Sequence, residues 1–203
     1  MNLTLQQTDL LKELINIGAG KAAGLINQMV GVHVRLELPE LIVVPPGETP
    51  DFAGRGFEEV LSAVRLGFRG AFTGWTGLVF SRNSANWLVS QLLGQVDTPP
   101  MDLDSLRIGA IQEVGNIVLN GVMGSIVNVL GENVGYFPPD YFESGIQDIL
   151  TSGNASERVV LLIKARFRLE DGVADGDILI FFSMDTFESL VRSLDRLLAQ
   201  AGA

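Results

Sequence analysis

The chain has 203 residues, of which 47% are hydrophobic and 19% are charged. Such a composition can bury a core, and it excludes a wholly disordered chain. The 14 Lys and Arg residues against 24 Asp and Glu residues leave a net charge of −10, which does not favour binding to a nucleic-acid backbone. The chain has no Cys and only one His, His33, so thiol catalysis, disulfides and Cys/His zinc sites are excluded.

The N-terminal residues 1–14 contain neither a basic segment nor an apolar one, and we expect no secretory signal. Residues 114–131 form the longest uncharged stretch, which approaches the length of a membrane span. Three Asn side chains lie within it, and their amides would be costly in hydrocarbon. We therefore expect a buried helix, no membrane partner and a cytoplasmic location.

An internal repeat organises the chain. Comparison of each residue with the residue 100 positions later, from 13 to 39, gives eight identities in 27 positions: Glu13, Asn16, Ile17, Gly24, Ile26, Gly31, Val34 and Pro39. Average composition would give about two identities. The sequence therefore predicts one domain made of two homologous halves, 1–98 and 103–203.

The predicted elements follow the same order in both halves. In the first half, apolar periodicity predicts a helix over 4–30, a strand over 32–38 that Pro39 ends, a loop over 45–56, strands over 60–68 and 71–80, and a helix over 84–93. Residues 95–104 form a short connector. The second half repeats the pattern with a helix over 105–130, a strand over 132–137, a loop over 138–156, strands over 158–169 and 177–184, and a helix over 186–199.

The predicted fold class is therefore α+β, with internally duplicated αβββα-type halves related by a pseudo-two-fold axis. The halves share one antiparallel sheet, and the long helices pack on it. Three glycines lie inside each long helix, where each costs about 1 kcal/mol relative to Ala. Close helix packing is the ordinary compensation, and we expect it at these positions: Gly18, Gly20, Gly24, Gly115, Gly121 and Gly124.

Polar residues form a stripe along the first predicted helix. Asp9, Glu13 and Asn16 follow helical spacing beside the apolar face, and Glu113 and Asn116 repeat the Glu-x-x-Asn pair in the second half. A solvated face would explain one copy, but two copies in register favour a function. An amide is no general base, although it can fix a water molecule by hydrogen bonds. Phosphoryl hydrolysis needs such a water and charge neutralisation, which a partner with its own phosphoryl group, Mg²⁺ and Lys would supply.

These residues resemble the motif of the CheC/CheX/FliY group of chemotaxis phosphatases, and most of all that of CheC. The motif is Asp or Ser, three residues, Glu, two residues, Asn, about 22 residues, and Pro. Asp9, Glu13, Asn16 and Pro39 fit it completely, and the second copy fits it with Glu113, Asn116 and Pro139, whereas Gly109 replaces the Asp or Ser.

The resemblance implies that the substrate is the aspartyl phosphate of a CheY-like receiver. It also implies that Asn16 or Asn116 orients the attacking water and that Glu13 or Glu113 pairs with the receiver's Lys. The receiver would supply Mg²⁺, so this chain needs no cofactor of its own. A CheD-like deamidase is implied as a further partner.

Pro39 and Pro139 are interpreted as structural residues that end a strand beside each active helix. Two alternatives remain open. Gly109 motivates a non-catalytic adaptor that binds a receiver or a CheD-like protein. The other is a self-contained hydrolase that uses two carboxylates.

Overall fold

The computed structural model describes residues 3–31, 33–48, 59–93, 105–151, 158–170 and 172–201. The elements in chain order are α1 (Leu5–Val30), β1 (Arg35–Val44), β2 (Val60–Gly70), β3 (Gly74–Ser81), α2 (Arg82–Leu93), α3 (Ser105–Val129), β4 (Val134–Tyr136), β5 (Asp140–Gly145), α4 (Ile146–Thr151), β6 (Arg158–Leu169), β7 (Gly172–Ser183) and α5 (Met184–Ala201).

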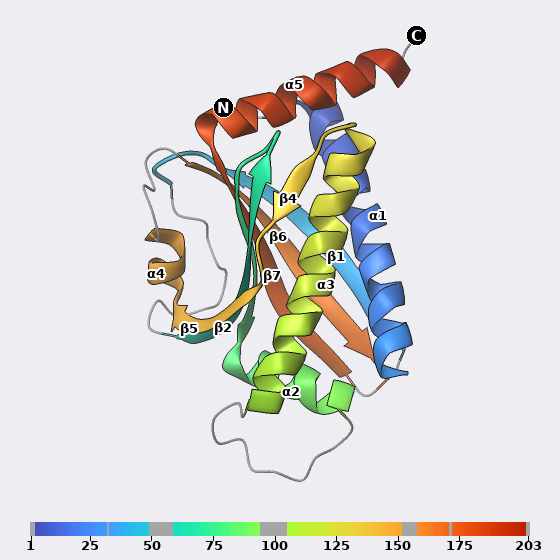
Figure 1. Cartoon of the computed structure of the whole chain (residues 1–203), viewed down its shortest axis with the longest axis vertical. Helices are drawn as coiled ribbons and strands as arrows, with labels where there is room; N and C mark the ends of the chain where they lie inside the picture. Colours follow the sequence, from blue (N-terminus) through green and yellow to red (C-terminus); the bar gives the residue numbers. More distant parts are fainter. Residues whose placement is uncertain are drawn as a thin grey trace.

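All strands in the described residues belong to one sheet, in which every pairing is antiparallel (Figure 1). The strand order is β1-β6-β7-β3-β2-β4, and β5 pairs with β2 beside β4. Strands from the two halves of the sequence are interleaved, because β1 pairs with β6 and both β4 and β5 pair with β2. The sheet and the helices on it confirm the α+β fold class, whereas the duplication within it stays a prediction.

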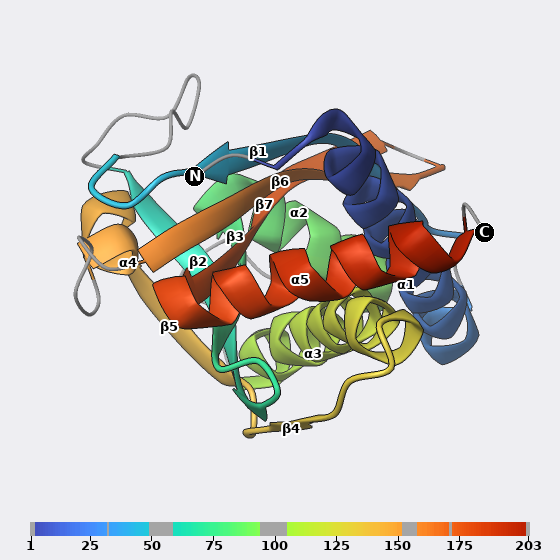
Figure 2. The same cartoon turned by 90° about the horizontal axis from the view of Figure 1, so that it is seen from above.

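The long helices α1 and α3 lie antiparallel on one face of the sheet, and α5 crosses over one end of both (Figures 1 and 2). Alternate residues of β6, such as Leu161 and Ile163, point into the main core beneath these helices. The intervening residues, such as Leu162, point to the opposite face, where they join a smaller cluster that contains Ile146 and Ile149 of α4. The sheet therefore separates the two long helices from the other face.

Local sequence signals determine both ends of α1. The Thr4 side chain accepts a hydrogen bond from the backbone N–H of Gln7, and the Gln7 side chain accepts one from the backbone N–H of Thr4. This reciprocal pair satisfies two N–H groups that a helix start leaves open. Gly31 ends the helix in the left-handed conformation, with φ at 68°, and Gly131 has φ at 70° just after α3. Glycine adopts this conformation without the cost that a Cβ would bring.

The backbones of α1 and α3 approach most closely at Gly18 and Gly121. A Cβ built on Gly18 would lie 2.7 Å from the Cα of Val122, and one built on Gly121 would lie 2.9 Å from the carbonyl oxygen of Gly18. Neither position can hold a side chain without moving the helices apart. The expected close packing is thus confirmed at these two glycines and at Gly115, where a Cβ would lie 2.6 Å from Val64, but a Cβ on Gly20, Gly24 or Gly124 would meet nothing within 4 Å.

The predicted first strand is wrong at both ends in the described residues. Strand β1 begins at Arg35 and continues to Val44, so Pro39 lies inside the strand and does not end it. The register shifts between Glu37, which pairs with Arg166, and Glu40, which pairs with Lys164. Proline has no backbone N–H to donate to a neighbouring strand. The sheet tolerates Pro39 because β1 is an edge strand and the residue lies in a bulge, where the regular hydrogen bonding is interrupted.

The predicted loop over 138–156 is wrong in its described part, because it contains β5 and α4. Parts of other predictions lie outside the described residues: position 32 of the first strand, most of the loop over 45–56, and the whole connector over 95–104. The remaining predicted helices and strands match the structure within a few residues, apart from β7, which begins at Gly172 instead of 177.

Among the described helices, α3 is the one that is long and apolar enough for a membrane span by length and composition, with a mean hydropathy of 1.2 over its most apolar window. However, 56% of that window is buried inside the protein, and core helices of folded domains pass the same test. Its side chains pack against α1, α2 and the sheet. The prediction that this stretch forms a packed helix is confirmed.

The glycine contact between α1 and α3 leads to a testable prediction. Gly18→Ala should lower the free energy of unfolding by about 1–3 kcal/mol, because the new methyl group overpacks the contact. Gly24→Ala is the matched control, since a Cβ there meets nothing within 4 Å, and it should raise stability by up to about 1 kcal/mol through helix propensity. Urea unfolding measures both changes, and a Gly18→Ala variant as stable as Gly24→Ala would contradict the packing.

Candidate functional site

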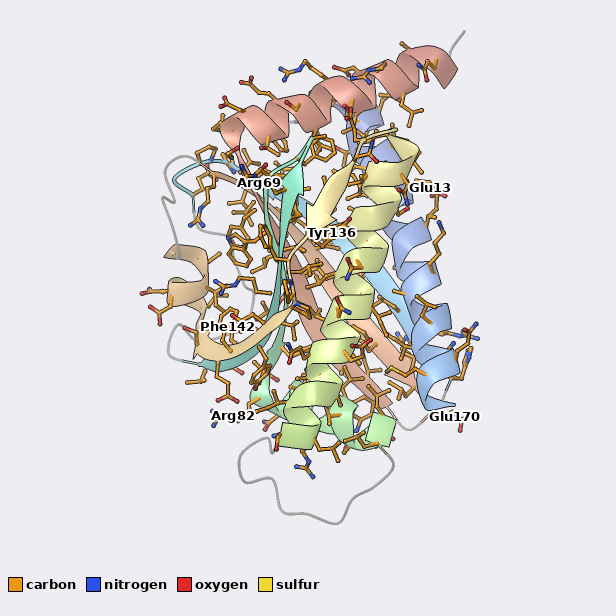
Figure 3. All side chains as sticks on the ribbon, viewed as in Figure 1. Glu13, Arg69, Arg82, Tyr136, Phe142 and Glu170 are labelled. Carbon is orange, nitrogen blue, oxygen red and sulfur yellow. The ribbon has the colours of Figure 1, made fainter. Side chains whose placement is uncertain are left out.

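The first candidate stripe lies on the solvent side of α1. Asp9, Glu13 and Asn16 are all exposed, whereas Leu14 and Ile15 between them are buried in the core. Figure 3 shows Glu13 on the side of α1 that faces away from the sheet. The helical period therefore places the carboxylates and the amide where another protein can reach them.

The second stripe lies on α3 and is less uniform. Glu113 is exposed, Asn116 is half-buried, and Gly109 leaves an exposed position without a side chain. Glu113 and Gly109 line an open cavity of about 490 Å³, together with Met29, Leu92, Leu93, Ser105, Leu106 and Ala110. Glu113 thus borders a largely apolar cavity, and Gly109 in its lining takes the position that Asp9 has in the first stripe.

The amide of Asn116 is held by a neighbour on its own helix. The Asn120 side chain donates hydrogen bonds from Nδ2 to Oδ1 of Asn116, at 2.7 Å, and to the backbone oxygen of Asn116, at 2.9 Å. Both residues line a groove of about 360 Å³ between the two long helices, with Lys21 and Leu25 on its α1 side. Asn120 is not among the site residues predicted from the sequence. Alignment of the two halves nevertheless places Asn120 opposite Gly20, one turn after the Asn of each stripe, and this difference is visible in the sequence.

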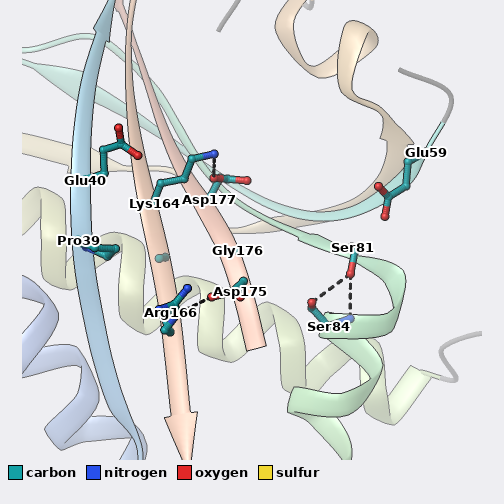
Figure 4. A pocket seen from close by; sticks show the side chains of 11 residues that line it. Pro39, Glu40, Glu59, Ser81, Ser84, Lys164, Arg166, Asp175, Gly176 and Asp177 are labelled. Carbon is teal, nitrogen blue, oxygen red and sulfur yellow. Dashed lines mark hydrogen bonds and ion pairs between the residues drawn. The ribbon is translucent and has the colours of Figure 1, made fainter. Parts of the chain in front are cut away.

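The structure separates Pro39 from Asn16. Pro39 lines a cavity of about 790 Å³ whose charged lining, Lys164 and Asp177 among it, lies on the sheet face opposite α1 (Figure 4). The prediction that Pro39 ends its strand is wrong, because β1 continues to Val44, whereas β1 does pack against α1 as expected. Its role as a structural residue is consistent with the bulge that it occupies in β1.

Pro139 also lies within an interrupted edge of the sheet. It stands between β4 and β5, which both pair with β2, so it interrupts an edge and does not simply end a strand. Its backbone oxygen accepts a hydrogen bond of 2.6 Å from Nε2 of Gln112, the residue before Glu113. Gln112 thus ties the second stripe to this edge, a link that helical periodicity alone does not reveal.

Clear pKa displacements occur in the sheet. Burial raises the pKa of Tyr141 to about 12, because the phenolate would lose its hydration. Burial also lowers the pKa of Arg158, whose guanidinium stands over the ring of Phe181. Both residues belong to strands of the sheet, β5 and β6. These shifted pKa values belong to groups in the sheet, where the sequence predicts no catalytic group.

Within the ranges that the structure describes, no three His, Asp or Glu side chains come close enough together to hold a metal ion. The candidate sites therefore offer exposed carboxylates, an exposed amide at Asn16 and a half-buried amide at Asn116. Such groups can bind a cation on a partner and can orient a water by donating and accepting hydrogen bonds. These groups can support hydrolysis only if a partner supplies the phosphoryl group and the positive charges that neutralise it.

Comparison with characterised proteins identifies relatives along most of the chain. A Halobacterium salinarum protein assigned as CheY-P phosphatase CheC1 is 20% identical over 95% of this chain and 98% of its own length. The Bacillus subtilis CheY-P phosphatase CheC is 27% identical over 61% of this chain and 60% of its own, and the flagellar motor switch phosphatase FliY of that species is 23% identical over 95% of this chain and half of its own. No family model matches the chain.

Solved structures share the fold at low identity. Thermotoga maritima FliY has a TM-score of 0.74 at 18% identity and covers 97% of this chain and 100% of its own. FliM from a Helicobacter pylori FliM–SpeE complex has a TM-score of 0.68 at 11% identity, with 96% and 97% covered. CheX from a CheX–CheY–BeF3–Mg²⁺ complex of Borrelia burgdorferi has a TM-score of 0.50 at 16% identity, with 83% and 98% covered.

The fold is therefore that of the FliY, FliM and CheX class of chemotaxis and flagellar proteins. Within this class the relatives that match by sequence carry the names CheC and FliY. These findings confirm the predicted resemblance to the CheC/CheX/FliY group of chemotaxis phosphatases.

The Gln112 link leads to a second prediction. Gln112→Ala should lower the free energy of unfolding by about 1 kcal/mol, because a half-buried hydrogen bond to Pro139 is lost. Gln28→Ala removes an exposed amide at the end of α1 and should change stability by less than about 0.5 kcal/mol. Thermal unfolding of both variants checks this, and equal effects would argue against the link.

Proposed function

We propose that this protein is a phosphatase that hydrolyses the aspartyl phosphate of a CheY-like receiver at two sites. Asn16 serves the first site with Glu13, and Asn116 serves the second with Glu113. The observation that carries the proposal is the exposed carboxylate–amide stripe on α1, matched by its counterpart on α3. The names of the sequence relatives support the same reaction class.

In the proposed reaction, the Asn side chain aims a water molecule in line with the acyl phosphate on the receiver. The water oxygen forms a bond to phosphorus, and the bond from phosphorus to the Asp oxygen breaks, which releases the receiver's carboxylate and inorganic phosphate. The amide contributes orientation, not proton abstraction. Mg²⁺ on the receiver would neutralise the charge on the phosphoryl oxygens.

Glu13 and Glu113 are proposed to pair with the receiver's Lys and so fix how the two proteins meet. Their exposure on the helices supports this role, since a partner's cation can approach either carboxylate. The CheX–CheY complex of B. burgdorferi is a precedent for a protein of this fold that binds CheY together with Mg²⁺. The protein is proposed to act in the cytoplasm, where a receiver would meet it.

We also infer that the two halves, 1–98 and 103–203, arose by duplication. The strand order supports this, because the corresponding strands of the two halves occupy mirrored positions in β1-β6-β7-β3-β2-β4. Gly31 and Gly131 hold the left-handed conformation after the two long helices, and Pro39 and Pro139 both interrupt an edge of the sheet. Within the ranges that the structure describes, α4 has no counterpart in the first half.

The second candidate function is a non-catalytic adaptor that binds a receiver or a CheD-like deamidase. The likeness to FliM, which was solved in complexes with SpeE and with FliG, favours it, since FliM binds protein partners on the same fold. Binding of a phosphorylated receiver without release of phosphate would favour the adaptor. A pull-down with a purified CheD-like deamidase tests that further partner.

Removal of both sites is the decisive test of hydrolysis. The variant Glu13→Ala, Asn16→Ala, Glu113→Ala, Asn116→Ala should release phosphate from a phosphorylated receiver about a hundredfold more slowly, because the water is no longer aligned. Each Glu–Asn pair removed separately should leave part of the activity. Asn83→Ala, an exposed amide on α2, is the matched control and should behave as the wild type. Undiminished turnover in the fourfold variant would rule out the assigned roles.

The two roles within one site are separable by kinetics. In a background that lacks Glu113 and Asn116, Glu13→Gln should raise KM about twofold to fivefold with little change in kcat, because an exposed ion pair to the receiver is lost. The effect should shrink at high salt. Glu48→Gln, an exposed carboxylate after β1, provides the control. A lower kcat at unchanged KM would contradict the pairing role for Glu13.

A further inference from the structure

The hydrogen bonds between Asn120 and Asn116 distinguish the second candidate site from the first. Both N–H groups of the Asn120 amide can be used, one toward the Asn116 backbone oxygen at 2.9 Å and one toward its Oδ1 at 2.7 Å. The two residues are four apart on α3, so they lie on the same side of the helix. Asn120 is therefore anchored to the helix while it holds the neighbouring amide.

The first site has no counterpart to this contact. Gly20 lies four residues after Asn16, at the position that Asn120 occupies after Asn116. A Cβ built on Gly20 would meet nothing within 4 Å, so a side chain could be accommodated there. Asn16 is exposed, whereas Asn116 is half-buried in the groove between α1 and α3. The two amides thus differ in their surroundings, although their Glu-x-x-Asn motifs are identical.

A hydrogen bond to Oδ1 affects an amide in two ways. It fixes the side-chain rotamer, and it determines which end of the amide is the acceptor, because only the oxygen can accept the Asn120 N–H. The oxygen has two lone pairs, so one remains to accept a hydrogen bond from a water molecule. An amide that is already oriented loses less conformational freedom when it aligns that water.

We propose that Asn120 is a positioning residue for the second site, where it orients the Asn116 amide before the receiver binds. This inference rests on the proposed function, since it concerns the same water-aligning step. The first site lacks this orientation, and its amide is ordered only in the complex. The two sites therefore differ in kcat for a reason outside the shared motif.

The kinetic test isolates each site in turn. In the Glu13→Ala, Asn16→Ala background, Asn120→Ala should lower kcat for phosphate release from a phosphorylated receiver about threefold to tenfold, with KM within about twofold. In the Glu113→Ala, Asn116→Ala background, Gly20→Asn should raise kcat by a similar factor, because it transplants the contact. Asn is also better tolerated than Gly in a helix, so this variant should fold.

A spectroscopic measurement tests the contact without any turnover. Side-chain ¹⁵N relaxation in the full chain should show the Asn116 amide more ordered than that of Asn16, and Asn120→Ala should remove the difference. An Asn116 amide whose order is unaffected by Asn120→Ala would overturn the proposal. So would a kcat that is unchanged or higher in Asn120→Ala.

Failure of the inference and failure of the proposed function have different outcomes. If the wild-type protein releases no phosphate from the receiver, the proposed function is wrong, and a positioning role in hydrolysis falls with it. If the second site releases phosphate but is insensitive to Asn120→Ala, the phosphatase stands and the role of Asn120 alone is overturned. Lower kcat in Asn120→Ala together with higher kcat in Gly20→Asn supports both.

Discussion

The close approach of α1 and α3 at Gly18 and Gly121 is the contact on which the candidate site depends. With hydrogen atoms in place of side chains, the two backbones can pack directly, and the apolar faces of both helices then rest on the same face of the sheet. The first polar stripe is left exposed on this helix layer, and Asn116 of the second stripe lines the groove between the two helices. A side chain at either glycine would shift one stripe relative to the other, so the contact positions both candidate sites.

Much of the fold could be predicted because its long elements have a clear period. Apolar spacing located α1 and α3, and the strands predicted over 60–68, 71–80 and 158–169 correspond to β2, β3 and β6. Pro39 was misread because proline usually ends a strand, whereas an edge strand with a bulge can contain it. The six residues of α4 are too few to show a helical period, and its placement depends on tertiary packing of Ile146 and Ile149 over the sheet.

The stripes could also be predicted, since helical spacing alone places Glu13 and Asn16 beside the apolar face. The sequence could not distinguish Gly18, which touches the other helix, from Gly24, which touches nothing within 4 Å, because the difference depends on where two distant helices cross. Asn120 was missed for another reason. Identity between the two halves marks the residues that they share, whereas Asn120 is a position at which the halves differ, since its counterpart is Gly20.

The two stripes differ at the positions on either side of their shared Glu–Asn pair. The first stripe carries Asp9 one turn before its Glu and Gly20 one turn after its Asn, whereas the second carries Gly109 before and Asn120 after. Each stripe thus has one polar side chain beyond the shared pair, at opposite ends of that pair. Asp9 adds a negative charge, whose influence on a partner extends over roughly a Debye length and weakens with salt. Asn120 adds only a short-range contact, which acts on the geometry of Asn116. Two surfaces with the same Glu-x-x-Asn motif therefore present different physical properties to a partner, one of them long-range and electrostatic, the other local and conformational.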